Sequence, residues 1–212
     1  MRLAVMLLML VLAQSAGAMS TPPPDVPRVT IERFGGRDVV VISGPILEET
    51  EAAFPAALAQ AGGRPLVFLD SPGGIIQSGL AIGRLIRANR LETVVPNRAI
   101  CFSACGLIWL AGGERWIGEG ARVGFHAASA APSRGRSTGR VSSSGNALVG
   151  AYLGQLGMND LQIGVLTEAS PGRMLVLNSL RPEQLAELDI AYRRGMPGAA
   201  PRARSAPKRP AG

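Results

Sequence analysis

Ser103 lies at the centre of the segment Cys101–Cys105 (CFSAC), at the expected start of a short apolar helix. The only histidine of the chain, His126, follows it, and a turn-forming segment, Ser71–Gly74 (SPGG), precedes it. A serine nucleophile needs a base within reach, backbone N–H groups directed at the developing oxyanion and a tight turn that exposes its oxygen. The sequence offers a candidate for each requirement. Together they would perform nucleophilic attack on a carbonyl carbon.

Each of these residues also has a structural interpretation. A serine before an apolar helix is usually an N-cap, and a single histidine at the end of an apolar strand often has only a structural role. We favour catalysis for His126 because it ends a strand just before a glycine- and serine-rich loop, residues 127–145, which we expect to be mobile. The only lysine, Lys208, lies in the C-terminal tail, so a Ser–Lys pair has no candidate.

The composition is that of one globular domain with a basic tail. The 212 residues are 47% hydrophobic, which suffices for one core. The formal net charge is +7, and no acidic residue follows Asp189. The basic residues of this last part are Arg193, Arg194, Arg202, Arg204, Lys208 and Arg209. We interpret residues 195–212 as a disordered, solvated extension, and we expect no nucleic-acid partner because no aromatic residues are interleaved with the arginines.

The N-terminal segment predicts an export signal over residues 1–18. Arg2 is followed by the apolar run Leu3–Ala13 and by the small residues Ala16–Ala18, which form a cleavage pattern. The apolar run is short for a membrane span, and an uncleaved N-terminal anchor is the alternative. A proline-rich leader follows over residues 19–27. The mature chain is therefore expected outside the cytoplasm, with no integral membrane segment after cleavage.

Between residues 28 and 194 short apolar strands alternate with helices. Gly35 and Gly36 predict a hairpin between the first two strands, and Pro55 is expected to weaken or divide the first helix. The expected strands are Val29–Glu32, Val39–Ile42, Leu66–Leu69, Thr93–Val95, Arg115–Ile117 and Arg122–Phe125, the last two joined through residues 118–120. The expected helices are Glu48–Ala61, Ile75–Asn89, a short one after Ser103, Ala147–Glu168 and Glu183–Leu188. This alternation predicts an α/β fold with a mainly parallel central sheet and repeated β-α-β units.

Three segments carry a resemblance to a known family. Residues 69–74 (LDSPGG), 101–106 (CFSACG) and 123–126 (VGFH) resemble, in this order, the signature segments of the Clp protease proteolytic subunit (ClpP) and its crotonase-like superfamily. Their joint spacing is far more specific than any one motif, and the resemblance covers about Val39–Asp189. An exported chain with a Cys-x-Ser-x-Cys segment is similar to the periplasmic ClpP-like proteins. The resemblance thus implies a ClpP/crotonase-like domain over residues 28–194 and a periplasmic location.

The resemblance also implies roles for individual residues. Ser103 would be the nucleophile, with His126 as its general base. The amides of Gly74 and Ala104 would form the oxyanion hole. The loop that binds substrate would include Gly73 and Ile75.

The third member of a catalytic triad is less well defined. The family places an acid in the helical region after the histidine, where this sequence offers Glu168 as first choice and Asp160 as second. A Ser–His pair oriented by a carbonyl or a hydroxyl group is the alternative. The segment Leu180–Leu185 resembles the closing helix of the family, but Arg181 departs from the Ser or Thr that members often carry before the proline.

Cys101 and Cys105 support a separate hypothesis. Export makes their oxidation to a disulfide feasible, provided that the chain turns sharply enough to bring the two Cα atoms within about 7 Å. Such a bond would hold the serine turn and make activity sensitive to reductant. The alternative is two buried thiols in a close-packed core. We expect no metal site, because only two cysteines and His126 are available nearby.

These observations lead to one functional hypothesis with two alternatives. The first is an exported, ATP-independent serine hydrolase, a peptidase acting on peptides or unfolded protein segments, without a cofactor and assembled as a homo-oligomer. A crotonase-like enzyme of acyl transfer or thioester chemistry could use the same oxyanion hole. A catalytically idle ClpP-like scaffold or binding protein would keep the fold alone.

Overall fold

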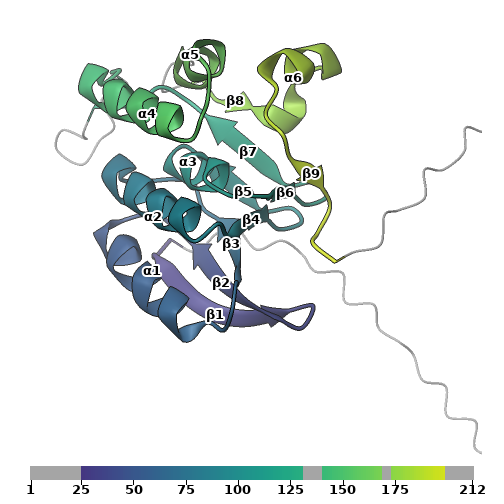
Figure 1. Cartoon of the computed structure of the whole chain (residues 1–212). Helices are drawn as coiled ribbons and strands as arrows, with labels where there is room; N and C mark the ends of the chain where they lie inside the picture. The colour runs from purple at the N-terminus through teal and green to yellow at the C-terminus, as the bar shows by residue number, and fades with distance from the viewer. Residues whose placement is uncertain (1–24, 131–139, 169–172, 199–212) are drawn as a thin grey trace, which may run out of the picture.

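The computed structural model describes residues 25–130, 140–168 and 173–198, and these form two sheets with helices packed on them (Figure 1). The strands are β1 (Arg28–Phe34), β2 (Arg37–Ser43), β3 (Leu66–Asp70), β4 (Glu92–Val95), β5 (Ile100–Phe102), β6 (Arg115–Ile117), β7 (Arg122–Phe125), β8 (Leu175–Val176) and β9 (Arg193–Arg194). The helices are α1 (Glu48–Gln60), α2 (Ile76–Ala88), α3 (Ala104–Leu110), α4 (Ser143–Gln155), α5 (Asp160–Glu168) and α6 (Pro182–Leu188), with a 3₁₀ turn at Leu177–Ser179.

The larger sheet has the strand order β1-β2-β3-β4-β6-β9. Strand β1 pairs antiparallel with β2 through the expected hairpin, in which Gly35 and Gly36 both have positive φ angles. The other four pairings are parallel, and α1, α2 and α3 lie between consecutive strands of the sheet in the chain. The prediction of an α/β fold with a mainly parallel central sheet is therefore confirmed.

Both faces of the larger sheet are apolar. Val40 and Val67 belong to the main core with the helices, whereas Val39 and Leu66 form a smaller cluster on the opposite face. All four side chains are at most 1% exposed. This burial explains why β2 and β3 are continuous apolar runs rather than alternating ones, as is typical of parallel strands.

The smaller sheet has the order β5-β7-β8, and the sequence analysis missed β5 and β8. It is joined to the larger sheet at Ser71, whose N–H donates to the carbonyl of Ile100 (2.8 Å) and whose carbonyl accepts from the N–H of Phe102 (3.1 Å). Strands β6 and β7, expected as a joined pair, belong to different sheets. Strand β5 has only three residues and β8 only two, so hydrophobic periodicity gives little evidence for either.

Two predictions about helices are wrong. Pro55 does not divide α1; it lies on the exposed face of an unbroken helix that Phe54 and Ala57 anchor in the core. The single helix expected over 147–168 is two helices, α4 and α5, separated near Gly157, which has a φ of +88°. Helix α4 begins earlier than expected because the Ser142 hydroxyl accepts a hydrogen bond from the N–H of Gly145 and caps it.

The termini are described only in part. The export signal over residues 1–18 and the tail beyond residue 198 lie outside the described residues, as do residues 131–139 of the expected loop. The extension expected from residue 195 begins as part of the domain, because the N–H of Gly195 donates to the carbonyl of Ile117 and Met196 packs on the smaller apolar cluster. No helix among the described residues is long and apolar enough to cross a membrane.

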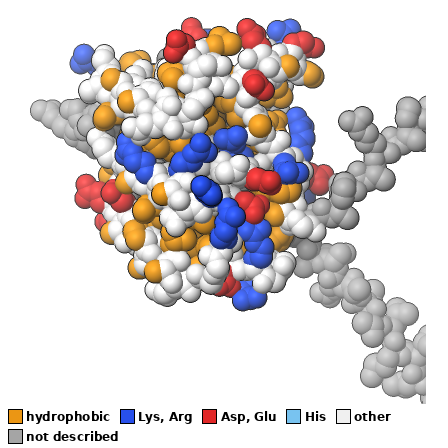
Figure 2. Space-filling model, viewed as in Figure 1, with side chains coloured by type: hydrophobic (Ala, Val, Ile, Leu, Met, Phe, Trp, Pro, Cys, Tyr) orange, Lys and Arg blue, Asp and Glu red, His pale blue; other side chains and the backbone are white. Residues whose placement is uncertain are grey.

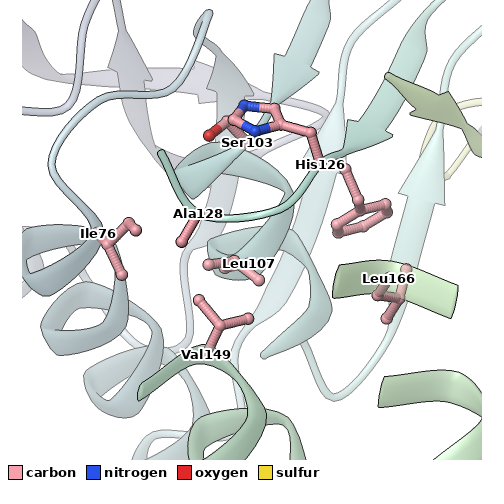
Figure 3. A pocket seen from close by; sticks show the side chains of 8 residues that line it. Ile76, Ser103, Leu107, His126, Ala128, Val149 and Leu166 are labelled. Atoms are coloured by element: carbon pink, nitrogen blue, oxygen red, sulfur yellow. The ribbon is translucent and has the colours of Figure 1, made fainter. Parts of the chain in front are cut away.

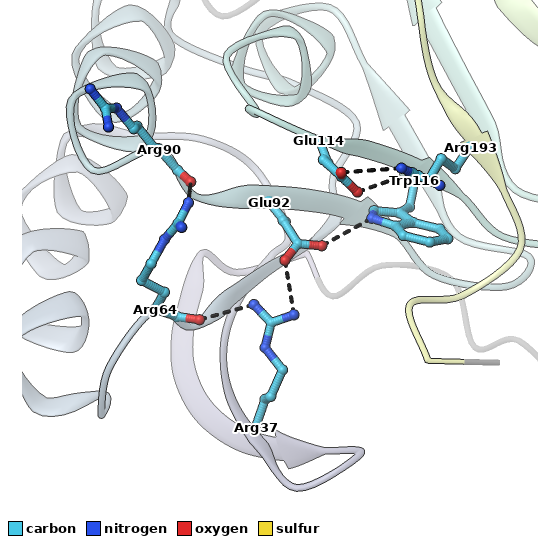
Figure 4. A network of polar contacts seen from close by, with 7 residues as sticks. All are labelled: Arg37, Arg64, Arg90, Glu92, Glu114, Trp116 and Arg193. Carbon is cyan, nitrogen blue, oxygen red and sulfur yellow. Dashed lines mark hydrogen bonds and ion pairs between the residues drawn. The ribbon is translucent and has the colours of Figure 1, made fainter.

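Charged side chains connect strands of the larger sheet (Figure 4). Glu92 accepts hydrogen bonds from Arg37 (2.9 Å) and from the indole of Trp116 (3.2 Å), and Arg193 pairs with Glu114. These partly exposed ion pairs contribute little, each about 0.2–1 kcal/mol. Figure 2 shows a band of arginine side chains, with acidic side chains among them, on the side of the molecule that is turned to the viewer in Figure 1.

The contact between Gly83 of α2 and Tyr152 of α4 provides a test of the helix packing. A Cβ atom at residue 83 would lie 2.0 Å from the Tyr152 hydroxyl oxygen, which itself donates to the carbonyl of Leu107 in α3 (3.0 Å). We expect Gly83→Ala to lower the free energy of unfolding by about 1–3 kcal/mol, because the extra methyl group overpacks the core. Denaturant unfolding measures this loss.

Two further variants control this experiment. Gly154→Ala in α4 meets no atom within 4 Å, so helix propensity alone should raise the free energy of unfolding by about 0.5–1 kcal/mol. Adding Tyr152→Phe to Gly83→Ala removes the oxygen that clashes, so the double variant should lose less stability than the sum of the two single changes. Additive losses would contradict this packing.

Candidate active site

Ser103 occupies a sharp turn between β5 and α3. Its φ of +56° and ψ of −122° are strained values for a residue with a side chain. A strand–serine–helix turn of this kind exposes the nucleophile in enzymes with a G-x-S-x-G motif. The Ser103 side chain is half-buried and makes no capping hydrogen bond, although the residue stands at the N-cap position. Its hydroxyl is therefore not used to cap the helix.

His126 follows β7 and lies beside Ser103 (Figure 3). Strands β5 and β7 are parallel neighbours in which Phe102 pairs with Gly124, so the residues just after each strand reach the same edge of the small sheet. The N–H of Ser103 also donates to the carbonyl of Gly124 (2.9 Å). This pairing brings the predicted nucleophile and the predicted base to one pocket.

The imidazole of His126 is oriented by a backbone carbonyl. Its Nδ1 atom lies 2.7 Å from the carbonyl oxygen of Ala127. A carbonyl only accepts hydrogen bonds, so this contact requires the proton on Nδ1 in the neutral ring and leaves the lone pair on Nε2. In this tautomer Nε2 is the nitrogen that can accept a proton.

Neither predicted acid contacts this histidine. Glu168 and Asp160 are both exposed on α5, and no carboxylate among the described residues forms a hydrogen bond or ion pair with His126. Leu166 of the same helix lines the pocket. Because each helical residue turns by about 100°, Glu168 lies about 200° from Leu166 and faces away from the pocket. The ring contacts the carbonyl of Ala127 instead, the kind of partner that the sequence left as the alternative to an acid.

The glycine loop before α2 packs directly on the serine turn. A Cβ atom at Gly73, which has a φ of +100°, would lie 2.6 Å from the carbonyl oxygen of Phe102 and 2.7 Å from the Cβ of Ser103. A Cβ atom at Gly74 would lie 2.1 Å from the carbonyl oxygen of Ile46. Both positions therefore require glycine, for backbone conformation at Gly73 and for space at both.

Two N–H groups beside the serine have no acceptor among the described residues. In the loop, the N–H of Gly73 donates to the Ser71 hydroxyl (3.0 Å) and that of Ile75 to the carbonyl of Ile46 (2.8 Å), but the exposed Gly74 makes no such bond. Ala104 is the first residue of α3, where a helix has no internal acceptor for its N–H. These are the two amides predicted for an oxyanion hole.

Apolar side chains from four helices and one strand form the pocket next to Ser103 and His126. They are Ile76, Leu107, Phe125, Ala128, Val149 and Leu166, with Ala128 in the segment after β7 (Figure 3). The predicted loop residue Ile75 does not line this pocket; its neighbour Ile76 does. The other lining residues were not predicted, because an apolar residue that lines a pocket and one that fills the core follow the same pattern in the sequence.

Cys101 and Cys105 form the disulfide expected from the sequence. Their Cα atoms are 5.0 Å apart, and both residues are fully buried. Nearby, the carboxylate of Asp70 at the end of β3 accepts a hydrogen bond from the N–H of Ile100 (3.1 Å). Partial burial raises the pKa of this carboxyl above its usual value, and the bond from Ile100 opposes that rise. Among the described residues, no group of three His, Cys, Asp or Glu could hold a metal ion.

No protein-family model matches the chain, and no curated protein matches its sequence. Many solved structures resemble it, among them two of one protease. A serine-to-alanine mutant of the 1510-N membrane-bound stomatin-specific protease has a TM-score of 0.54 and 17% identity, covering 74% of this chain and 77% of its own. A lysine-to-alanine mutant of the same protease, in complex with a substrate peptide, has a TM-score of 0.53 and 17% identity, covering 74% of this chain and 73% of its own. This chain therefore has the ClpP-like α/β fold, in agreement with the fold that its three signature segments predicted.

Proposed function

We propose that this chain is a serine peptidase in which Ser103 is the nucleophile and His126 the general base. The observation that carries the proposal is the strained backbone of Ser103 beside His126, with two unpaired N–H groups next to the turn. Strain of this kind persists only where the surrounding structure enforces it, and it is concentrated at functional sites. The resemblance to a protease of the same fold supports the same reaction.

Each of these groups has a role in the proposed reaction. Nε2 of His126 takes the proton of the Ser103 hydroxyl as its oxygen attacks the substrate carbonyl. The N–H groups of Gly74 and Ala104 donate to the oxyanion that forms. The imidazolium then protonates the leaving amine, and water releases the acyl group by the same steps in reverse. The carbonyl of Ala127 keeps the ring in the required tautomer, but without the full negative charge with which a carboxylate would stabilise the imidazolium.

The apolar lining of the pocket supports a peptide substrate with an apolar side chain next to the cleaved bond. The cavity itself measures about 10 Å³, room for one water molecule, so its lining must move apart for that side chain to enter. Its lining beside the two polar residues is entirely apolar. Burial of such a side chain is favourable by about 0.8 kcal/mol per methylene group. One of the related structures holds a substrate peptide, which supports the same substrate class here. The proposed cleavage needs no ATP and acts on peptides or unfolded protein segments.

Export and assembly are further parts of the proposal. The apolar run and small residues within 1–18 support secretion into the periplasm, with retention by an uncleaved segment as the alternative. The Cys101–Cys105 disulfide supports an oxidising compartment. The proposal that the chain forms a homo-oligomer rests only on the resemblance to ClpP.

One observation favours a second candidate, an idle scaffold that keeps the fold. No carboxylate among the described residues contacts His126, and such a partner strengthens the base in many serine hydrolases. The two candidates differ in whether Ser103 reacts at all. A probe of serine reactivity therefore separates them.

Labelling with a fluorophosphonate probe tests the nucleophile and base. We expect the full chain to be labelled, Ser103→Ala to show no labelling, and His126→Ala to react ~10³-fold more slowly or worse. Glu168→Gln and Asp160→Asn should react at the rate of the unchanged chain, because neither carboxylate contacts the histidine. A folded chain that does not react would favour the scaffold, and slow labelling of Glu168→Gln would assign the acid to that residue.

Gly73→Ala tests the contact between the glycine loop and the serine turn. The added methyl group must displace either the carbonyl of Phe102 or Ser103 itself, so we expect a labelling rate about 100-fold lower. Gly35→Ala is the matched control, since it also places alanine at a positive φ but meets no atom within 4 Å. It should lose stability only through that backbone conformation, and so less than Gly73→Ala, and it should keep its labelling rate. Equal rates in the two variants would contradict the contact.

Val149→Ala tests the pocket as the site that selects the substrate side chain. The smaller side chain enlarges the pocket, so kcat/KM should shift by ~10-fold toward peptides with a larger apolar residue before the cleaved bond. Leu148→Ala removes an exposed side chain from the same helix and should leave the preference unchanged. Cleavage of a peptide series, followed by mass spectrometry, measures both. An unchanged preference in Val149→Ala would show that substrate binds elsewhere.

A further inference from the structure

We infer that the Cys101–Cys105 disulfide is a positioning element that holds Ser103 in its reactive backbone conformation. The inference rests on the proposed function, because it assigns a role in the reaction of Ser103. It concerns two residues that touch neither the substrate pocket nor the histidine in the described contacts. Their effect is exerted through the backbone of the turn between them.

The two cysteines occupy special positions in the turn. They lie two residues before and two residues after Ser103, which are the positions of the glycines in a G-x-S-x-G turn. The chain folds back so sharply there that the Cα atoms of residues 101 and 105 are 5.0 Å apart. Glycine suits such a turn because it has no side chain. Here two side chains point at each other, and a covalent bond joins them.

The bond connects the two elements between which the strained serine lies. Cys101 belongs to β5 and pairs with Val123 of β7, and Cys105 lies in the first turn of α3. Ser103 has a φ of +56°, which a serine does not prefer. If β5 and α3 could move apart, the turn could relax to an ordinary conformation and carry the hydroxyl away from His126. The disulfide prevents that separation.

The other restraints on this turn are non-covalent: two backbone hydrogen bonds of Ser103 and the close packing of Gly73 on the turn. The N–H of Ser103 donates to the carbonyl of Gly124, and its carbonyl accepts from the N–H of Leu107 (3.2 Å). Both are single hydrogen bonds, each of which contributes only about 0.5–1.5 kcal/mol to stability on balance. We expect the rest of the domain to fold without the bond, because the core around it contains more than thirty buried residues. Loss of the bond should therefore alter the turn and leave the fold intact.

The burial of the disulfide decides whether a reductant can open it in the folded chain. Both cysteines are 0% exposed and belong to the main core. Thiol–disulfide exchange requires a thiolate to reach one of the sulfur atoms, which cannot happen until the turn opens. We therefore expect reductant to affect activity only after the chain has unfolded, and the bond to persist in the folded chain.

The experiment compares four samples of the full chain: the unchanged sequence and the variant Cys101→Ala/Cys105→Ala, each with and without reductive treatment. Treatment consists of unfolding in denaturant with dithiothreitol and refolding in its presence; the untreated samples undergo the same unfolding and refolding without it. One dithiothreitol gives two electrons and two protons to the bond, leaving two cysteine thiols and its own cyclic disulfide. Alkylation under denaturing conditions and intact mass confirm the state of the sulfur atoms. The fluorophosphonate probe then gives both the labelling rate and the final fraction labelled.

A positioning role and a merely structural role have different signatures. If the bond positions Ser103, the reduced unchanged chain should be labelled ~10- to 100-fold more slowly than the oxidised chain but reach the same final fraction. The double variant should be equally slow and indifferent to dithiothreitol. With peptides, kcat should fall while KM stays constant, because Ile76, Val149 and Leu166 form the pocket from helices outside the turn.

Four results would contradict a positioning role of the disulfide. Equal labelling rates for the oxidised and reduced unchanged chain would overturn the inference and leave the peptidase intact. A lower final fraction at an unaltered rate would also overturn it, since the bond would then only maintain folding. Two free thiols in the untreated chain would remove its basis. Failure of the oxidised unchanged chain to react would overturn the proposed function itself, and with it this inference.

Discussion

The parallel pairing of β5 with β7 is the interaction on which the site depends. It aligns Phe102 with Gly124, so that the residue after β5 and the residue after β7 share one edge of the small sheet. The hydrogen bond from the N–H of Ser103 to the carbonyl of Gly124 extends that alignment to the serine itself. Without this pairing, the two polar residues would have no common pocket. The larger sheet contributes by holding β5 at the end of β3 through Ser71.

Close backbone approach is the second constraint. Gly106 of α3 packs on Phe125 and Gly73 packs on the serine turn, with no room for a larger residue at either position. Gly79 of α2 packs on Ala104, where a Cβ atom would lie 3.1 Å from its neighbours. The 27 glycines of the chain and its few aromatic residues suit a core of this kind. Because these contacts join segments far apart in the sequence, small shifts in any of them would reach Ser103. The site is thus a property of the packed helices and not of one loop.

The environment of the histidine departs from the usual triad. A backbone carbonyl orients the ring through Nδ1, and the acids on α5 point elsewhere. A carbonyl fixes the tautomer as well as a carboxylate does, but it offers only a dipole to the imidazolium that forms. The serine turn, in contrast, is restrained from both sides by a covalent bond. The proposed nucleophile is therefore rigid, whereas the proposed base has no carboxylate to stabilise its charged form.

The sequence by itself determined the features that depend on local order. The Cys-x-Ser-x-Cys segment, the SPGG turn and the lone His126 predicted the serine turn, its disulfide and the strand end that carries the histidine, and the alternation of strands and helices predicted the fold. Only the tertiary structure decided the partner of the histidine, the pocket lining and the placement of β6 and β7 in separate sheets. Turns and helices arise from interactions between neighbours in the chain. Which face of α5 is directed at the pocket, and where a three-residue strand pairs, are decided by packing between distant segments. Glu168 shows the difference, since its place in the sequence suited a catalytic acid and its place on α5 does not.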